Sequence, residues 1–325
     1  MFKIKKPLFL ICETPLHAGS GSDLGIVDLP IQRERHTNFP KIEASSLKGA
    51  LREASETYVL ESTSNKMVDL KELNKIFGYD EGALKGVSKE QMKNLFENEE
   101  KEFAGCIGFT DARLLLFPVK SLYGVFAWIT CPRVIKRFIN DLQLTGVSFD
   151  FNTEGVIEGR TPNGCESLYS KEKIIQLEEF IFNKIQVESN DGNISKFATW
   201  LSQKVFEGYG DYWQEKAAED IVVLSDEDFR DFVTITTEVI TRTKIDNERG
   251  TVESGALFSE EYLPAESVMY SLAMFADENF KNSAVKSDAV HKKFEGYLNG
   301  NNNIVQIGGN ATLGKGIVKT KLINA

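Results

Sequence analysis

The chain has 325 residues, of which 42% are hydrophobic and 26% charged, and its formal net charge is −10. This composition excludes an intrinsically disordered chain, the apolar runs are too short to span a bilayer, and the acidic balance excludes a uniformly basic coat for nucleic acid. The four cysteines are scattered without a C-x-x-C pair, which excludes a zinc motif or a disulfide framework. A reducing, cytoplasmic location is therefore expected.

Residues 2–13 predict a buried strand, because the apolar side chains at 8–12 leave neither face polar. A long irregular segment with several glycines and prolines follows at residues 14–44. Loops of this length inside a compact domain are usually functional. We therefore expect the functional site to include this segment.

A helix is predicted at residues 45–60, with Ser45 or Ser46 as its cap. The side chains expected to face the core recur at helical spacing and are Leu47, Leu51, Ala54 and Tyr58. Lys48 and Arg52 fall one turn apart on another face, next to the free N–H groups at the start of the helix. This arrangement predicts an anion site, although a solvated basic face explains the pattern equally well.

The basic character extends backwards along the chain from this helix. Residues 33–52 carry five basic side chains against two acidic ones, in a protein that is acidic as a whole. Such local asymmetry is typical of an RNA-binding strip. Arg33 and Arg35 are its members within the irregular segment.

Residues 61–103 are rich in Lys, Glu and Asn and predict a surface insertion. Two weak helical patterns lie within this insertion, at residues 67–77 and 91–96.

Strands are next predicted at residues 107–117 and 123–130, joined by a turn at 118–122, and a helix is predicted at 132–142. The order is then strand, helix, strand, strand, helix. This order matches the α+β ferredoxin-like arrangement, which RNA-recognition modules share, provided that a last strand completes it.

The segment at 145–235 is a variable middle region in which helices are predicted at residues 194–206 and 226–235. Residues 238–258 then predict a hairpin with its turn at 247–250. The hairpin is poor in apolar side chains, so we expect it to project from the core. The remaining predicted elements are a strand at 266–275, a helix at 285–298, and strands at 304–307 and 317–323.

A glycine-rich loop at residues 308–316 joins the last two predicted strands. It resembles the start of a nucleotide-binding P-loop, but Gly316 replaces the hydroxyl residue that would bind magnesium, and no helix follows. Two explanations remain. Gly308, Gly309 and Lys315 can contact RNA phosphates, or the glycines are needed for a tight hairpin with positive φ.

Acid and base candidates gather in the irregular segment: His17, Asp23, Asp28, Glu34 and His36. RNA carries its own nucleophile, the 2′-hydroxyl, so its cleavage requires positioning, a base or metal, and charge stabilisation at phosphorus. A carboxylate beside arginines can provide these. A metal-free pair of His17 and His36 is the alternative.

The segment also contains a recognisable sequence, HAGSG from His17 followed by GIVDLPIQRERH ending at His36. It closely resembles the opening of the repeat-associated mysterious proteins (RAMPs), and among them the backbone subunit of the type III-B CRISPR effector, the Cmr complex. Further blocks resemble the same family in the same order, at residues 40–52, 109–122, 257–264 and 308–316. The resemblance runs over nearly the whole chain and implies a single domain at 1–325.

The resemblance implies a ferredoxin-like palm and a projecting hairpin, the thumb, within the predicted hairpin. Several copies would stack into a helical filament along one guide RNA, together with other Cmr subunits and without a membrane. Each thumb would open the guide–target duplex, and the target RNA would be cut at regular intervals. Specificity would come from base pairing, as in other RNA-guided systems.

Asp28 falls on the catalytic aspartate of this family, and His17, Glu260 and Tyr262 fall on neighbouring functional positions. The implied endoribonuclease reaction is a metal-dependent attack by the 2′-hydroxyl, in which Asp28 binds Mg²⁺ or Mn²⁺ or orients the attacking group. The RNA-binding residues that we expect from pattern and resemblance are Arg33, Arg35, Ser45, Ser46, Lys48, Arg52, Arg242, Lys244, Gly308, Gly309 and Lys315.

Two other functions are compatible with the sequence. In the first, the chain is a catalytically silent structural subunit of an RNA-binding filament, and Asp28 is only a turn residue. In the second, it is a stand-alone nuclease that processes guide RNA through His17 and His36.

Overall fold

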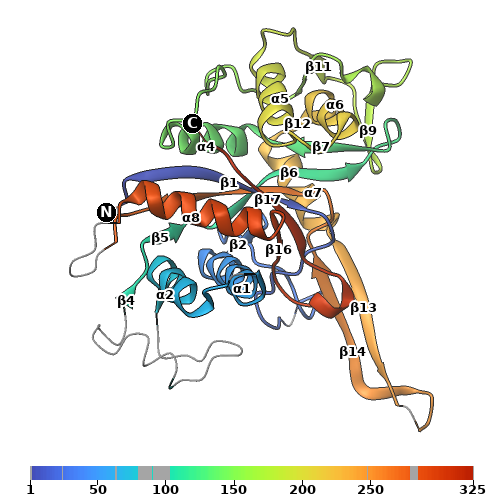
Figure 1. The fold of residues 1–325 in the computed structure, drawn as a ribbon. Helices are drawn as coiled ribbons and strands as arrows, with labels where there is room; N and C mark the ends of the chain where they lie inside the picture. Colours follow the sequence, from blue (N-terminus) through green and yellow to red (C-terminus); the bar gives the residue numbers. More distant parts are fainter. Residues whose placement is uncertain are drawn as a thin grey trace.

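The computed structural model describes residues 2–23, 25–62, 64–79, 90, 103–246, 248–278 and 285–324. One large mixed sheet crosses the molecule (Figure 1). Its strands are β1 (Ile4–Cys12), β2 (Lys41–Ile42), β5 (Ile107–Phe109), β6 (Ala112–Lys120), β7 (Phe126–Thr130), β8 (Arg160–Thr161), β11 (Gln186–Val187), β12 (Ile221–Val223), β15 (Val268–Phe275), β16 (Ile304–Gln306) and β17 (Ile317–Leu322). They follow the order β11-β8-β12-β7-β6-β15-β1-β17-β16, while β2 pairs with β6 and β5 with β15.

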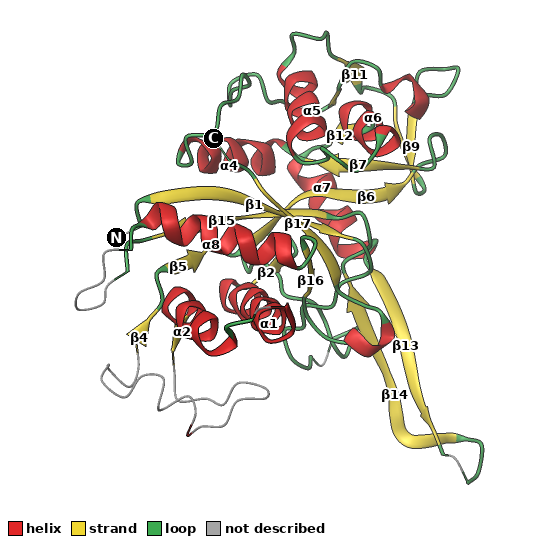
Figure 2. Cartoon of the chain, viewed as in Figure 1, coloured by secondary structure: helices red, strands yellow, loops and turns green. Residues whose placement is uncertain are grey.

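The strand predicted at residues 2–13 is confirmed as β1, which lies inside the sheet between β15 and β17. Helices cover both faces of the sheet (Figure 2). On one face, Phe9 packs against Phe138 of α4 (Pro132–Gln143), with ring centroids 5.8 Å apart. On the other face, Phe294 of α8 (Ser287–Gly300) packs against Phe275 at 5.9 Å. This double coverage explains why β1 has no polar face.

The helix predicted at residues 45–60 is α1 (Ala44–Ser62), but its buried face is rotated from the expected one. The residues that it buries are Leu47, Leu51, Ser55 and Val59. The expected core residues Ala54 and Tyr58 are only partly buried. Ser55 can occupy a buried position because its hydroxyl donates to the Leu51 carbonyl oxygen at 2.7 Å.

The pattern at residues 67–77 is confirmed as α2 (Lys66–Phe77), but this helix is not part of a surface insertion. It buries Leu70, Leu73, Ile76 and Phe77 in the core. An apolar face of this width binds a helix to the domain. The pattern at 91–96 lies outside the described residues.

The two strands predicted at residues 107–117 and 123–130 are present, with different boundaries. The first is divided into β5 and β6. Pro118, expected in the turn, lies inside β6 opposite Trp128, and the chain turns at residues 121–125 instead. The helix expected at residues 132–142 is confirmed as α4, in which Arg133 follows the initial Pro132.

The middle region adds two confirmed helices, α5 (Asn193–Lys204) and α7 (Asp226–Ile235). It also contains α6 (Asp211–Glu219) and β12, which the sequence pattern did not predict. Since β12 has only three residues, its fully buried sequence is too short for a periodic signal. It pairs in parallel with β7 and so extends the main sheet.

A long antiparallel pair, β13 (Glu238–Ile245) and β14 (Val252–Tyr262), projects away from the sheet (Figure 1). This confirms the predicted hairpin, although β14 continues to Tyr262 and so reaches the body of the protein. The predicted strands on either side of the glycine-rich loop are confirmed as β16 and β17. None of the helices in the described ranges is both long and apolar enough to cross a membrane.

A close backbone approach at Gly105 provides a test of this packing. Gly105 lies between β4 (Phe103–Ala104) and β5, where an added Cβ would be 2.3 Å from the carbonyl oxygen of Ile76. We expect Gly105→Ala to lower the free energy of unfolding by about 1–3 kcal/mol, measured by urea denaturation, because the backbone of α2 must move. Gly49→Ala, at an exposed helical position with open space, is the control and should raise it by about 0.5–1 kcal/mol. Identical urea denaturation curves for Gly105→Ala and the unaltered chain would contradict the close approach of Gly105 to the backbone of α2.

Candidate functional site

The irregular N-terminal segment is bound to the base of the projecting hairpin by backbone pairing. Leu29 pairs with Glu260 of β14, and Leu16 pairs with Leu263 immediately after this strand. The Leu29 N–H also donates to the carbonyl oxygen of Ser259 at 3.0 Å. These contacts place Asp28 beside β14.

Asp28 is exposed, and one oxygen of its carboxylate is held by Ser259. Its Oδ2 accepts hydrogen bonds from the Ser259 backbone N–H at 2.7 Å and from the Ser259 hydroxyl at 2.8 Å. The backbone hydrogen bond, followed by the one from the hydroxyl, lowers the pKa of Asp28. The carboxylate is therefore ionised at neutral pH, which suits a metal ligand or an orienting acceptor better than a proton acceptor.

The other three residues assigned by resemblance, His17, Glu260 and Tyr262, form a buried cluster. The Tyr262 hydroxyl donates to Glu260 Oε2 at 2.6 Å, and His17 Nε2 lies 3.6 Å from Glu260 Oε1. Burial, followed by the Glu260 carboxylate, raises the pKa of Tyr262 to about 12. Tyr262 therefore remains a hydrogen-bond donor at neutral pH.

The glycine-rich loop and β13 join this cluster through two further side chains. Asn310 Nδ2 donates to Glu260 Oε1 at 2.6 Å and to the Tyr262 hydroxyl at 3.1 Å. Arg242 Nε lies 2.9 Å from Glu260 Oε2, and its Nη2 donates to the Tyr262 hydroxyl. Burial alone would raise the pKa of Glu260, but the hydrogen bonds from Tyr262 and Asn310 and the charges of His17 and Arg242 outweigh it and lower the pKa.

The glycine loop owes most of its glycines to backbone geometry. Gly308, Gly314 and Gly316 all have positive φ, and a Cβ on Gly308 would lie 2.2 Å from the His17 carbonyl oxygen. The Gly309 N–H donates to this same oxygen at 3.0 Å. The tight-hairpin explanation therefore accounts for these positions. Lys315, whose Nζ is 4.9 Å from the Tyr262 ring centroid, is the loop's cation at the site.

The four assigned catalytic residues thus divide between two sides of β14. Side chains alternate along a strand, so Glu260 and Tyr262 share one side while Ser259, which holds Asp28, is on the other. Asp28 is exposed, whereas the side chains of Glu260 and Tyr262 are almost fully buried. No pattern within the sequence indicated this division.

Glu261 organises the Asp28 side of the strand, and sequence analysis did not single it out. Only 5% exposed, it accepts the Ile31 N–H at Oε2 (3.0 Å) and the Thr237 hydroxyl at Oε1 (2.8 Å). Arg33 also donates to Oε1, and its Nη1 donates to the carbonyl oxygens of Asn38 (2.8 Å) and Val233 (2.9 Å). Arg33, expected to bind RNA, therefore has its donors directed into the protein.

The start of α1 is capped by a residue that the sequence analysis did not select. The helix begins at Ala44, whose N–H donates to Asp111 Oδ1 at 2.9 Å. Asp111 also binds Lys41 at 3.0 Å. The expectation that Ser45 or Ser46 is the cap is thus wrong, because both already lie inside the first turn. Asp111 lies in the block at residues 109–122 that resembles the RAMP family. This resemblance was the only feature of the sequence that pointed to Asp111.

Lys48 and Arg52 do not form the expected joint anion site. Arg52 donates to Glu56, to Asn74 and to the Gly78 carbonyl oxygen, at 2.6, 2.8 and 3.1 Å, and so ties α1 to α2. Lys48 donates to the Ile107 carbonyl oxygen at 3.1 Å. Burial, and then the charge of Arg52, lowers the pKa of Lys48. Each nitrogen of the Arg52 guanidinium thus donates to a protein acceptor, which directs this side chain toward α2.

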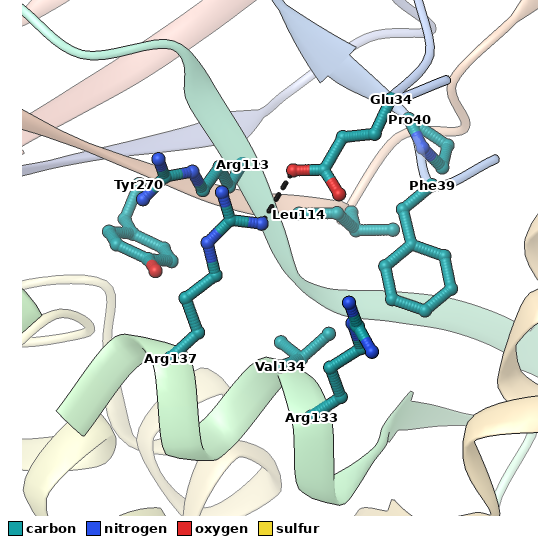
Figure 3. A pocket seen from close by; sticks show the side chains of 9 residues that line it. All are labelled: Glu34, Phe39, Pro40, Arg113, Leu114, Arg133, Val134, Arg137 and Tyr270. Carbon is teal, nitrogen blue, oxygen red and sulfur yellow. Dashed lines mark hydrogen bonds and ion pairs between the residues drawn. The ribbon is translucent and has the colours of Figure 1, made fainter. Parts of the chain in front are cut away.

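Other basic side chains remain at the surface. Arg35 is exposed, and within the described ranges it has neither a hydrogen bond nor an ion pair through its side chain. Its neighbour Glu34 binds Arg137 Nη1 at 2.7 Å in the hollow shown in Figure 3. Lys244 is exposed on β13.

The two histidines of the metal-free alternative belong to different surroundings. His17 is in the buried cluster, and its Nδ1 lies 2.7 Å from the carbonyl oxygen of Glu261. His36 is exposed, with Nε2 3.7 Å from Glu34 Oε2. No contact among the described residues joins the two rings, so this geometry does not favour an acid–base pair.

The described ranges contain no group of three or more His, Cys, Asp or Glu side chains suited to a metal ion. Both donors of Ser259 are nevertheless directed at Asp28 Oδ2 and not at Oδ1. Mg²⁺ often takes only one or two carboxylates and completes its shell with water and substrate phosphates. Asp28 fits a site of this kind, which RNA itself would complete.

Comparisons with known proteins agree with one another. A family model described as the RAMP superfamily matches residues 9–319. The CRISPR system Cmr endoribonuclease Cmr4 of Pyrococcus furiosus is 39% identical over 309 residues, which cover 95% of this chain and 92% of the relative. The CRISPR system CMR subunit Cmr4 of Saccharolobus solfataricus is 26% identical over an alignment of 338 residues, which covers 98% of this chain and 96% of the relative. A crystal structure of oligomeric Cmr4 from P. furiosus has a TM-score of 0.65 at 31% identity and covers 99% of this chain and 100% of its own.

The hold of Ser259 on Asp28 can be tested by titration. Ser259→Ala removes the hydroxyl donor and keeps the backbone donor, so the pKa of Asp28 should rise toward its ordinary value of 3.8. An NMR titration of the Asp28 carboxyl carbon measures this shift. Thr241→Ala is the control, because Thr241 lies opposite Ser259 on β13 and carries a hydroxyl that does not contact Asp28. An unchanged pKa in Ser259→Ala would show that the hydroxyl does not hold the carboxylate in solution.

Proposed function

The chain belongs to the RAMP superfamily, and we propose that it is the backbone subunit of a type III-B CRISPR effector that binds guide RNA and cleaves the paired target RNA. One observation carries the catalytic part: Asp28 is an exposed, ionised carboxylate anchored to the base of the hairpin, in a chain 39% identical to a Cmr endoribonuclease. A relative was solved as an oligomer, which supports assembly of this chain into a filament with other Cmr subunits. The buried free cysteines suit a reducing cytoplasm.

The finer architecture in this proposal is a ferredoxin-like palm made of β17, β1, β15 and β5. The order of these strands and the positions of α1 after β1 and α8 after β15 support it. In this palm β7 is not the third strand and α4 is not the second helix, although the sequence suggested these roles. Instead β7 extends the sheet beyond the palm, and α4 packs on a face of the sheet. The pair β13 and β14 is the thumb.

The RNA contacts divide into surface and supporting residues. Arg35, Lys244 and Lys315 offer charge to RNA phosphates, and Ser45 and Ser46 present the first turn of α1 to an anion. A second group acts from within the protein by fixing the loops and helices that meet RNA. This supporting group comprises Arg33, Lys48, Arg52, Arg242, Gly308 and Gly309, whose contacts are with protein atoms.

In the proposed reaction the target's 2′-hydroxyl attacks the adjacent phosphorus, the bond to the 5′-oxygen breaks, and a cyclic phosphate and a 5′-hydroxyl result. A bound Mg²⁺ or Mn²⁺ supplies charge stabilisation at the phosphate. Asp28 would hold this ion, or would orient the attacking hydroxyl, while Ser259 fixes Oδ2 of its carboxylate. His17, Glu260 and Tyr262 position β14 and the loops around Asp28 from the buried side of the strand.

The alternative is a catalytically silent filament subunit, and the bonds that Ser259 makes to Asp28 are the observation that favours it. An aspartate that accepts from a neighbouring strand is also a common structural connection. The two functions differ in what loss of the Asp28 charge would do, because only cleavage requires it.

We therefore expect Asp28→Asn to lower the rate of target cleavage about 10²–10⁴-fold in the assembled complex, with guide and target binding retained. Cleavage is measured on labelled target RNA in Mg²⁺ or Mn²⁺, and binding by gel shift. Asp288→Asn, at an exposed position in the first turn of α8, is the matched control and should cut at the normal rate. Undiminished cutting by an Asp28→Asn complex would overturn the catalytic assignment of Asp28. A complex with intact Asp28 that does not cut target RNA in Mg²⁺ or Mn²⁺ would leave the silent subunit as the function.

Arg35 and Arg52 should respond differently to truncation. Arg35→Ala should weaken RNA binding and lower the slope of log K against log salt by about 0.7–0.9, because one phosphate contact is lost. Arg52→Ala should instead lower the free energy of unfolding by about 1–3 kcal/mol, because three acceptors lose their donor. Salt-dependent RNA titrations and denaturation curves measure the two effects. If Arg52→Ala instead lowered the slope of log K against log salt as much as the loss of one phosphate contact does, and left the free energy of unfolding unchanged, Arg52 would be an RNA-binding residue and not a supporting one.

A further inference from the structure

A separate pocket, which shares no residue with the candidate site, lies where the end of β1 meets β7, α6 and the segment that joins α5 to α6. Its walls are largely aromatic, formed by Trp128, Phe206, Tyr209 and Trp213. The Trp128 ring centroid is 6.2 Å from that of Trp213 and 5.2 Å from that of Phe206. The cavity has a volume of about 50 Å³, far below the several hundred Å³ of sites that enclose small molecules. It can therefore take a head group but not a nucleotide.

Two carboxylates, Glu13 and Glu266, share this pocket with the rings. Neither has an ion-pair partner in the described part of the chain, and burial followed by the charge of Glu13 raises the pKa of Glu266. The hydroxyl oxygen of Tyr209 is also buried there, beside Glu13, and makes no hydrogen bond of ordinary geometry with the described residues; burial and then the charge of Glu13 raise the pKa of Tyr209. Glu13 is exposed and Glu266 is partly buried, so the pocket carries two negative charges without an ion-pair partner in the described ranges, next to a buried hydroxyl. A group that is both cationic and a hydrogen-bond donor would complement these charges and the hydroxyl oxygen.

Cations already approach this aromatic cluster from within the chain. Lys319 Nζ lies 3.7 Å from the ring centroid of Tyr209, and Lys216 Nζ lies 4.1 Å from that of Phe126, whose ring packs at 6.4 Å on Trp213. Lys319 forms no ion pair with Glu13 or Glu266 among the described residues. The rings therefore have the cation–π character that an aromatic cage uses, while the two carboxylates remain without a counter-charge.

We propose that this pocket binds the head group of an organic cation, a primary ammonium or a guanidinium, between the rings of Tyr209 and Trp213 and the carboxylates of Glu13 and Glu266. The same chemistry is available at the end of a lysine or arginine side chain and in a free polyamine. The cation's N–H groups donate to the carboxylates and to the Tyr209 oxygen, and its positive charge faces the rings.

The test uses the full chain labelled with 5-fluorotryptophan and n-butylammonium as the probe. The chain has three tryptophans, so ¹⁹F NMR reports on the pocket through Trp128 and Trp213, and Trp200, which packs on Phe9 instead, serves as an internal reference. We expect saturable shifts of the first two resonances and none with the uncharged n-butanol. Absence of a saturable shift with n-butylammonium would overturn the proposal.

Variants separate the pocket from general acidity. Glu266→Gln should weaken n-butylammonium binding roughly tenfold, because a charge-assisted hydrogen bond is lost. Tyr209→Phe keeps the ring, removes the hydroxyl and should weaken binding less. Glu215→Gln, an exposed change on the same helix as Trp213 but outside the pocket, is the matched control and should bind normally. Equal affinities for Glu266→Gln and Glu215→Gln would also overturn the proposal.

A spermidine titration distinguishes the two sources of the cation. Spermidine has more amines than n-butylammonium, so the two affinities are compared per amine. A higher affinity per amine for spermidine supports a free polyamine as the ligand. Equal binding per amine shows that only one head group is recognised, which supports the end of a lysine or arginine side chain. Either result agrees with the proposed cation site.

Discussion

The site depends on two consecutive buried carboxylates, Glu260 and Glu261, at the base of the projecting hairpin. Because side chains alternate along β14, the two carboxylates point to opposite sides and need separate sets of partners. Glu260 takes Tyr262, Arg242 and Asn310, whereas Glu261 takes Ile31, Arg33 and Thr237. One dipeptide thus joins the N-terminal segment, the start of β13 and the glycine-rich loop.

This arrangement explains how an exposed loop can hold a functional carboxylate in one place. Asp28 has few contacts of its own, but Ser259 next to Glu260 fixes one of its oxygens, and Leu29 continues the pairing with β14. A rigid strand bearing an exposed group is a more accurate support than a free loop. The proposed division of labour follows: His17, Glu260 and Tyr262 position the strand from one side, while Glu261 supports the side on which the exposed Asp28 meets RNA.

Charge is distributed in a similar way. The strip at residues 33–52 is basic in sequence, yet Arg33 and Arg52 direct their donors to protein acceptors, while Arg35 remains open to solvent. Paired and unpaired cations contribute very differently to RNA binding, because only an unpaired one exchanges counterions with phosphate. An acidic protein can therefore bind RNA through a small number of correctly placed side chains.

Most of the elements and the family were determined by the sequence alone. Long apolar or periodic segments such as β1, α1 and α7 carry enough signal within themselves, and the block around Asp28 identified the RAMP resemblance. Tertiary structure alone decided which predicted residues share a site, because partners such as Glu261 and Arg33 are 228 residues apart. It also decided that Asp111 caps α1, that Ser55 rather than Ala54 faces the core, and that Asp28 and Glu260 lie on opposite sides of one strand. These outcomes depend on strand register and on contacts between distant segments, and no local pattern of residues encodes either.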